Sequence, residues 1–483
     1  MSVAVETFVL DPAHTGTLQR QLQEQVTAGI LSGRFRPGDR MPSSRGLARH
    51  LGVSRITVTL AYTELVANDY LTSRGRSGYF VSDGAPTPPG LPMGKTVETD
   101  RVDWQAAMVR RFSDGPDLER PRDWRRYRYP FIYGQTDARL FDHRNWRRCA
   151  LQALGARDFD ATTSDSYGRD DPLLVEQILR HILPRRGIAA EPEQVLITLG
   201  AQNALWMVTR ILLAQDRLAV TEHPGYPALR TILAKSGARN LPLAVDAEGL
   251  PPDTVPSETD VLFVTPSHHC PTSATMPVAR RRALLARADR HDFLIVEDDY
   301  EFELAFAAPP APALKSLDRS GRVVYIGSFA KSLFPGLRLG YMVAPARFIA
   351  EARALRSLLV RHVPGHLQRA AAYFLEQGHY DAQIHRMART YRDRRAVADA
   401  AIVQHGLTPL GANSFGGSSF WMQSRCGPAE ALAARLRPRG VLIEPGGPFF
   451  GEGDPGDRYR LAYSSIAAAD IPEGLRRIAE AGG

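Results

Sequence analysis

The segment Tyr325-Ile-Gly-Ser-Phe-Ala-Lys-Ser-Leu-Phe-Pro-Gly-Leu-Arg-Leu-Gly-Tyr341 is the most informative stretch of this chain. It continues a β-branched and aromatic run that starts at Val323, and Lys331 follows three residues after Ser328. Arg338 comes seven residues after the lysine. An amine can form a Schiff base, a hydroxyl can contact a phosphate, and a guanidinium binds a phosphate dianion. A lone lysine is usually a surface residue, but this set at a strand end predicts a pyridoxal phosphate (PLP) site.

Size and composition describe a two-part globular protein. A chain of 483 residues is too long for one core, and its 44% apolar and 23% charged residues are ordinary for a soluble protein. The net charge of +8 permits an anionic partner without proving one. Cys149, Cys270 and Cys426 are widely spaced, which argues against disulfides and a zinc site and favours a reducing cytoplasm. We see no signal peptide and no apolar run long enough to cross a membrane.

The order of patterns along the chain predicts its domains. Residues 82–94 are rich in proline and glycine, which indicates a linker. We expect a winged helix-turn-helix domain at 1–82, a linker at 83–130 and an α/β domain at 131–483. Short apolar runs alternate with helical patterns in the last of these, which predicts a mostly parallel sheet with a smaller α+β lobe from about 380. The runs are 195–198, 218–221, 261–265, 293–296 and 323–326.

The first 81 residues read as a DNA-binding module. Helical spacing runs from Leu18 to Leu31, Ser43 or Ser44 can cap a second helix, and Ser54 can cap a third. A helix, a short turn with glycine and a second helix form a helix-turn-helix, whose second helix enters the major groove. Residues 70–81 read as two strands of a wing. The candidate DNA-contacting residues are Ser44, Arg45, Ser54, Arg55, Thr57, Arg74 and Arg76, although exposed arginines are often merely solvated.

The remaining pieces of the PLP site follow other strands. Gly200, Ala201 and Gln202 open a helix after the first strand, where backbone N–H groups can cradle a phosphate. Tyr226, after the next strand, can lie on the pyridine ring, although an aromatic residue in a loop is more often packing.

An acidic run, residues 297–301, follows the strand before Lys331. Asp298 can accept from the protonated pyridine nitrogen, and Tyr300 can donate to the phenolic oxygen of the cofactor. Such a run could also be a metal site or a solvated turn. The lack of histidine nearby and the lysine on the next strand favour the cofactor.

Two sets of motifs resemble known families. Arg-Pro-Gly-Asp-Arg-Met-Pro-Ser-Ser-Arg-Gly-Leu-Ala, Leu-Gly-Val-Ser-Arg-Ile-Thr-Val and Gly-Tyr-Phe-Val resemble the GntR winged helix. Residues 130–480 resemble fold-type I aminotransferases, and the fusion resembles the MocR/GabR family of regulators. The resemblance implies that Lys331 carries PLP, that Ser328 and Arg338 bind its phosphate, and that Arg460 binds the carboxylate of a ligand. It also implies a homodimer.

The chain departs from the aminotransferase pattern at one cofactor contact. Cys270 stands where aminotransferases carry an asparagine before Pro-Thr-Gly, so the contact of that asparagine with the phenolic oxygen is in doubt. His268 or His269 can substitute for it, although histidines in loops are usually solvated.

These patterns predict a cytoplasmic PLP-dependent regulator that binds a double-stranded DNA operator. It senses a small amino compound through aldimine exchange at Lys331 and has at most weak or partial transaminase activity. One alternative is a working aminotransferase with an accessory DNA-binding domain. Another is a direct sensor of PLP that controls vitamin B6 synthesis. The sequence does not name the effector, the operator or the direction of regulation.

Overall fold

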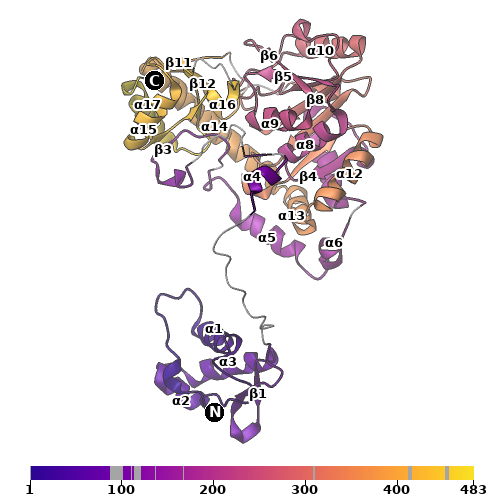
Figure 1. Ribbon diagram of the computed structural model, residues 1–483. Coiled ribbons are helices and arrows are strands. Elements are labelled where there is room, and N and C mark those ends of the chain that lie inside the picture. The colour runs from indigo at the N-terminus through magenta and orange to yellow at the C-terminus, as the bar shows by residue number, and fades with distance from the viewer. Residues whose placement is uncertain are drawn as a thin grey trace. The chain divides into compact units, whose positions relative to one another are not determined.

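The computed structural model describes residues 2–86, 102–109, 111–113, 121–135, 137–166, 168–307, 311–411, 416–451 and 456–482, and it leaves the Arg76 side chain undescribed. Two compact units make up the chain, Met1–Arg110 and Arg111–Gly483 (Figure 1). Much of the expected linker at 83–130 lies outside the described residues.

The first unit contains three α-helices of eight or more residues, an antiparallel ribbon and a short fourth helix. Each of the three longer helices starts at a hydroxyl residue whose side chain accepts from a backbone N–H three residues on, namely Thr17, Ser43 and Ser54. Leu22, Val26, Leu47, Val58 and Leu65 belong to its buried core. Its elements are η1 (Val5–Thr7), α1 (Leu18–Leu31), α2 (Ser44–Leu51), α3 (Arg55–Ala67), β1 (Leu71–Ser73), η2 (Gly75–Ser77), β2 (Tyr79–Val81) and α4 (Trp104–Ala107).

A seven-stranded sheet in the order β4-β10-β9-β8-β7-β5-β6 organises the second unit. Only β10 runs antiparallel to its neighbours, so the predicted mostly parallel sheet is confirmed. Each of the five predicted apolar runs lies largely within one of its strands. The strands are β4 (Val195–Thr198), β5 (Leu218–His223), β6 (Arg239–Ala244), β7 (Val261–Val264), β8 (Leu294–Asp299), β9 (Val323–Ser328) and β10 (Gly340–Val343).

Helices cover both faces of this sheet (Figure 1), because successive strand residues point to opposite sides. Tyr325 packs into one core cluster, whereas Val324 and Ile326 pack into another. The helices of this part are α5 (His143–Ala153), α6 (Phe159–Thr163), α7 (Pro172–Gln177), α8 (Ala201–Leu212), α9 (Pro227–Ser236), α10 (Val278–His291), α11 (Leu314–Leu317), α12 (Ala346–Val360) and α13 (Gly365–Glu376). A π-helical turn (Ile178–Ile182) and a 3-10 turn (Leu183–Arg186) continue α7.

The predicted smaller lobe follows. It holds a four-stranded antiparallel sheet in the order β11-β12-β15-β14. Strand β3 (Tyr129–Pro130), far earlier in the sequence, pairs in parallel with β13 of this lobe. The other elements are α14 (His379–Gln404), β11 (Thr408–Pro409), β12 (Ser419–Gln423), α15 (Ala429–Leu436), β13 (Val441–Leu442), β14 (Glu444–Pro445), α16 (Gly447–Phe450), β15 (Arg458–Ala462) and α17 (Ile471–Glu480).

Candidate cofactor and effector site

A cavity of about 280 Å³ lies at the carboxyl ends of the parallel strands in the second unit. Open parallel sheets bind their ligands at this edge. Gly200, which does not line the cavity, lies against Arg338, which does. The cavity is lined by the other predicted site residues of this unit: Ala201, Gln202, Tyr226, Asp298, Tyr300, Ser328, Lys331, Arg338 and Arg460.

Lys331 follows β9, and its amine lies 4.0 Å from the centre of the Tyr133 ring. Every residue of β9 is buried, so the strand is a rigid base for the loop that carries the lysine. Gly327 in β9 must be glycine, because a Cβ atom there would lie 2.2 Å from Cζ of Tyr341 in the neighbouring strand. The packing of the sheet therefore positions a primary amine at the cavity.

An anion cradle forms one end of the cavity. Gly200 precedes α8 with a φ of 82°, and a Cβ atom on it would lie 3.1 Å from Nη2 of Arg338. That Arg338 nitrogen donates to the backbone carbonyl of Leu199 at 3.2 Å. The Ser328 hydroxyl lies nearby in the cavity wall and accepts from the N–H of Ala330. A helix N-terminus, a guanidinium and a hydroxyl together suit a phosphate dianion.

The acidic run at the end of β8 divides between the two sides of the strand. Asp298 lines the cavity, whereas the alternation of a strand turns Glu297 and Asp299 away from it. Asp299 accepts from Nε of Arg186 at 2.6 Å and from the Tyr325 hydroxyl at 2.8 Å. Asp299 is therefore committed to a buried ion pair and is not an equivalent cavity acid.

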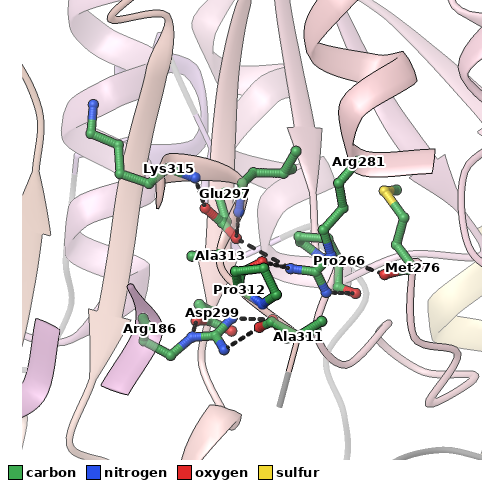
Figure 2. Close-up of polar contacts among 12 residues, drawn as sticks. Arg186, Pro266, Met276, Arg281, Glu297, Asp299, Ala311, Pro312, Ala313 and Lys315 are labelled. Carbon is green, nitrogen blue, oxygen red and sulfur yellow. Dashed lines mark hydrogen bonds and ion pairs between the residues drawn. The ribbon is translucent and has the colours of Figure 1, made fainter. Parts of the chain in front are cut away.

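Glu297 closes a second buried network behind the sheet. It accepts from the backbone N–H groups of Leu314 and Lys315, both at 2.9 Å, and lies 4.0 Å from Nη1 of Arg281. Figure 2 shows Arg281 and Arg186 also binding backbone carbonyls of the segment between β8 and α11. Glu297 and Asp299 thus stabilise the end of β8, which carries Asp298.

Asp298 has the environment expected of a partner for a cation. Its Oδ1 is buried and has no hydrogen-bond partner among the described residues. Burial and the neighbouring Asp299 raise the pKa of Asp298 to about 7, while Lys331 acts against them. A pyridinium N–H would satisfy this oxygen and favour its charged form. With the amine of Lys331 and the cradle at Arg338, the residues present fit PLP.

Aromatic residues form the walls. Tyr226 lines the cavity, and its hydroxyl donates to Gln202 at 3.2 Å. Tyr300 lies edge-on to Tyr133, with ring centres 6.5 Å apart. Burial raises the pKa of Tyr300 well above its usual value, so its phenol keeps its proton and can donate.

Arg460 enters the cavity from β15 of the smaller lobe. Its guanidinium lies over two rings, 3.9 Å from the centre of Tyr133 and 4.7 Å from that of Phe449. Its Nε donates to Glu444 at 2.8 Å, and its Nη1 lies 3.9 Å from Sγ of Cys270. Arg460 and Glu444 are both buried, so a protein carboxylate already neutralises this arginine.

Cys270 lines the cavity, but the adjacent histidines do not. The ring of His269 contacts the Thr272 hydroxyl at 2.7 Å and lies 3.6 Å from Glu222, while His268 lies 3.8 Å from Glu301. Burial lowers the pKa of His269 to about 3, so this ring is neutral. Neither histidine is placed to replace the missing asparagine.

Sequence reasoning missed several residues of this region. Tyr133, Thr265 and Phe449 line the cavity, and Glu444 lies behind it. Glu222, in the wall of an adjoining cavity of about 70 Å³, accepts from the hydroxyl and N–H of Thr265. Burial raises the pKa of Glu222 to about 7. Of these residues, only Glu222 had a sequence signal that could have identified it, because it is an acid near the end of a buried strand.

The candidate DNA-contacting residues lie in the first unit. Ser44 and Arg45 begin α2, and Ser54, Arg55 and Thr57 begin α3. The Ser54 hydroxyl accepts from the N–H of Thr57 at 3.1 Å and also contacts the Thr57 hydroxyl at 2.9 Å. Arg55 is exposed and lies 3.5 Å from the Ser44 hydroxyl.

Of the two predicted wing arginines, Arg74 alone has a described side chain. The Arg74 guanidinium lies over the Phe80 ring at 4.7 Å in the wing, and the Arg76 side chain lies outside the described part of the chain.

The described part of the chain contains no group of three or more histidine, cysteine, aspartate or glutamate side chains able to hold a metal ion. None of its helices is both long and apolar enough to span a membrane.

Comparison with known proteins assigns both units. Residues 18–81 match the gntR family of bacterial regulatory proteins, and residues 141–478 match aminotransferase class I and II. The chain is 58% identical, over 100% of both chains, to the HTH-type transcriptional regulator TauR of Rhodobacter capsulatus. It is 32% identical to the probable rhizopine catabolism regulatory protein MocR of Rhizobium meliloti, over 98% of this chain and 95% of that one.

A solved structure agrees with the second assignment. The α-aminoadipate aminotransferase LysN of Thermus thermophilus superposes with a TM-score of 0.70 at 26% identity, over 79% of this chain and 98% of that one. The predicted fold-type I aminotransferase architecture is therefore confirmed. With a GntR winged helix ahead of an aminotransferase class I and II domain, and with full-length relatives that are HTH-type regulators, the chain belongs to the MocR-type family of transcriptional regulators.

Proposed function

We propose that this protein is a PLP-dependent transcription regulator that binds a double-stranded DNA operator and senses a small amino compound at Lys331. In this proposal residues 1–82 bind DNA, residues 83–130 link the domains, and residues 131–483 bind the cofactor and the effector. The protein acts in the cytoplasm as a homodimer.

One observation carries the proposal. A primary amine, an unpartnered buried carboxylate oxygen and an anion cradle surround a single cavity, in a chain that also holds a winged helix. PLP has an aldehyde, a pyridine nitrogen and a phosphate to match these three groups. Lys331 would hold the aldehyde end, Asp298 the nitrogen, and Arg338 with Ser328 and the start of α8 the phosphate. When bound, the cofactor supplies an electrophilic carbon for which an amine can compete with Lys331.

Arg460 supports an effector that carries an anionic group as well as an amine. Glu444 occupies its Nε, while its Nη1 lies beside Cys270 in the cavity wall. The Nη side of the guanidinium thus remains for a carboxylate or sulfonate. An amino acid or an amino sulfonate combines this group with the amine that would displace Lys331.

The switch we propose is a change of partner for Lys331. An effector that takes the place of the lysine leaves a free amine in the cavity and adds an anion at Arg460 on the smaller lobe. These changes favour one arrangement of the second unit over another, and the linker transmits the difference to the winged helix. A ligand shifts such an equilibrium only by its difference in affinity for the two states.

A working aminotransferase is the second candidate. Lys331, Asp298 and Arg460 line the cavity together, and half-reactions of that kind require the three roles proposed for them. Repeated turnover of an amino acid with a keto acid would identify the enzyme, whereas a regulator would show binding with little turnover.

The test combines absorption spectroscopy with DNA binding. Full-length protein loaded with PLP is titrated with a panel of amino acids and amino sulfonates, and its binding to DNA fragments selected from a random duplex pool is measured in parallel. We expect one class of amine to change both the cofactor absorption band and the DNA affinity, and we expect Lys331→Ala to lose both responses. A Lys331→Ala protein with a wild-type DNA response to the same amine would overturn the proposal.

A further inference from the structure

The recognition helix α3 carries two large apolar side chains on its solvent side. Ile56 is 70% exposed and Leu60 is 51% exposed, one helical turn apart. The opposite side of α3 supplies Val58, Ala61 and Leu65 to the core of the unit. Packing within the domain therefore does not account for an isoleucine and a leucine on the outer side.

The hydroxyl groups at the start of α3 already have local partners. Ser54 caps the helix by accepting from the N–H of Thr57, and the two hydroxyls also contact each other. Thr57 is half-buried, whereas Ile56 beside it is one of the most exposed apolar residues of the unit. The outward surface of the first two turns therefore presents Arg55, Ile56 and Leu60.

Charge indicates what covers this apolar surface. Between Asp39 and Glu64 the chain contains four arginines and no acidic residue. A basic surface of this kind fits a polyanion better than a second protein domain. In the major groove of DNA, thymine alone among the four bases presents a methyl group, and apolar side chains contact it there.

We propose that Ile56 and Leu60 read the 5-methyl groups of thymines in the operator. The inference rests on the proposed DNA-binding function of the first unit, and it adds the base class that α3 selects. Arg55 and the backbone phosphates would supply the affinity around these contacts, while the two apolar side chains would discriminate thymine from cytosine.

The test removes the methyl group and nothing else. The full-length protein selects binding sites from a random duplex pool, and the best duplex is then made again with deoxyuridine at one thymine position at a time. Uracil keeps the base pairing of thymine but lacks its methyl. We expect uracil to weaken wild-type binding about fourfold at one or two positions, the usual effect of one methyl-sized apolar contact.

Variants then connect each methyl group to a side chain. With Ile56→Ala, the uracil and thymine duplexes should bind equally at the position that Ile56 reads, and Leu60→Ala should do the same at another. Leu18→Ala is the matched control, because Leu18 is 45% exposed at the start of α1. It should keep the full preference for thymine.

Three results would overturn the inference. The first is wild-type binding that is unaffected by uracil at every position, which leaves the DNA-binding function standing. The second is an Ile56→Ala or Leu60→Ala protein that keeps its methyl preference but changes its oligomeric state, which would identify a protein contact. The third is selection of no DNA sequence at all, which would also refute the proposed DNA-binding function.

Discussion

Arg460 donates through Nε to Glu444 at 2.8 Å, and the two residues stand directly opposite each other on adjacent antiparallel strands of the smaller lobe. Both side chains are almost fully buried. The arginine that the family resemblance implies as the ligand-carboxylate residue is therefore also one half of a buried ion pair. Removal of one partner alone leaves an uncompensated charge, which typically costs about 3–5 kcal/mol.

Because Arg460 is paired with Glu444, its proposed binding of a ligand carboxylate is best tested by replacing both residues. The double variant Arg460→Met, Glu444→Gln removes both charges at similar volume, so we expect it to fold and to retain PLP, whose proposed contacts lie elsewhere. Its cofactor spectrum should no longer respond to the amino-acid panel. Arg460→Met alone should lose thermal stability as well, and Glu444→Gln alone should still respond. A full effector response in the double variant would show that Arg460 is only structural.

Substitutions of Asp298 and Asp299 at the end of β8 should affect different properties of the protein. We expect Asp298→Asn to weaken PLP retention and shift the absorption band, because the pyridinium loses its counter-charge. Asp299→Asn should instead lower the free energy of unfolding, because Arg186 would remain buried without its partner. Equilibrium dialysis of PLP and chemical denaturation measure the two effects. A wild-type spectrum and PLP affinity in Asp298→Asn would exclude Asp298 as the nitrogen partner.

The buried carboxyl group of Glu303 should make the stability of the protein depend on pH. Its Oε1 accepts from the Tyr380 hydroxyl at 2.8 Å, and its Oε2 is buried without a hydrogen-bond partner in the described part of the chain. Burial raises the pKa of this carboxyl from 4.5 to about 8. Between these two values the folded protein holds a proton that the unfolded chain has released, so this group makes stability fall as pH rises from about 5 to 8.

Glu303→Gln should reduce that slope by one proton, about 1.4 kcal/mol per pH unit. Denaturant unfolding at several pH values measures it, with Glu376→Gln at an exposed position as the control. The same slope in Glu303→Gln and wild type would contradict the prediction.

Substitutions in the first unit should distinguish a residue that contacts bases from one that contacts phosphates. Arg55→Ala should cost about 1–3 kcal/mol on the selected operator and much less on unrelated DNA. Arg74→Ala should weaken both duplexes alike and reduce the slope of log K against log salt by about 0.9 for each lost phosphate contact. Fluorescence anisotropy at several salt concentrations checks both. Operator binding by a protein that lacks residues 1–84 would refute the role of this unit.

The protein should be a homodimer in solution. Large apolar side chains remain exposed on the single chain, among them Leu358 at 84%, Leu151 at 60% and Phe159 at 56%. Burial of such side chains between two copies of the chain would favour association. Light scattering at micromolar concentration should give twice the chain mass of 53.3 kDa. A PLP-loaded protein of single-chain mass would contradict the prediction.

Much of the architecture follows from local patterns in the sequence. Ser43, one of the two predicted caps of its helix, and Ser54 cap their helices as the sequence indicates, because a cap depends on only three residues of chain. Buried strands such as β9 are continuous apolar runs, which a parallel sheet covered on both faces requires. Strands without that signature, such as the half-exposed β6, escaped prediction.

The order of the motifs in the sequence likewise indicated where the cavity lies. Ligand-binding residues follow successive parallel strands, and the carboxyl ends of these strands meet at one edge whatever the loops between them do. Lys331, Asp298, Tyr226 and Arg338 line one cavity at this edge.

Only the tertiary structure decided the partners of these residues. Tyr133 comes from a segment before the first helix of the large unit, and no spacing in the sequence places it against Lys331 and Arg460. Glu444 meets Arg460 through the register of two strands that α16 separates in the sequence. Local sequence sets backbone conformation, whereas burial of charge depends on which distant strands pair, and that choice belongs to the packing of the whole domain.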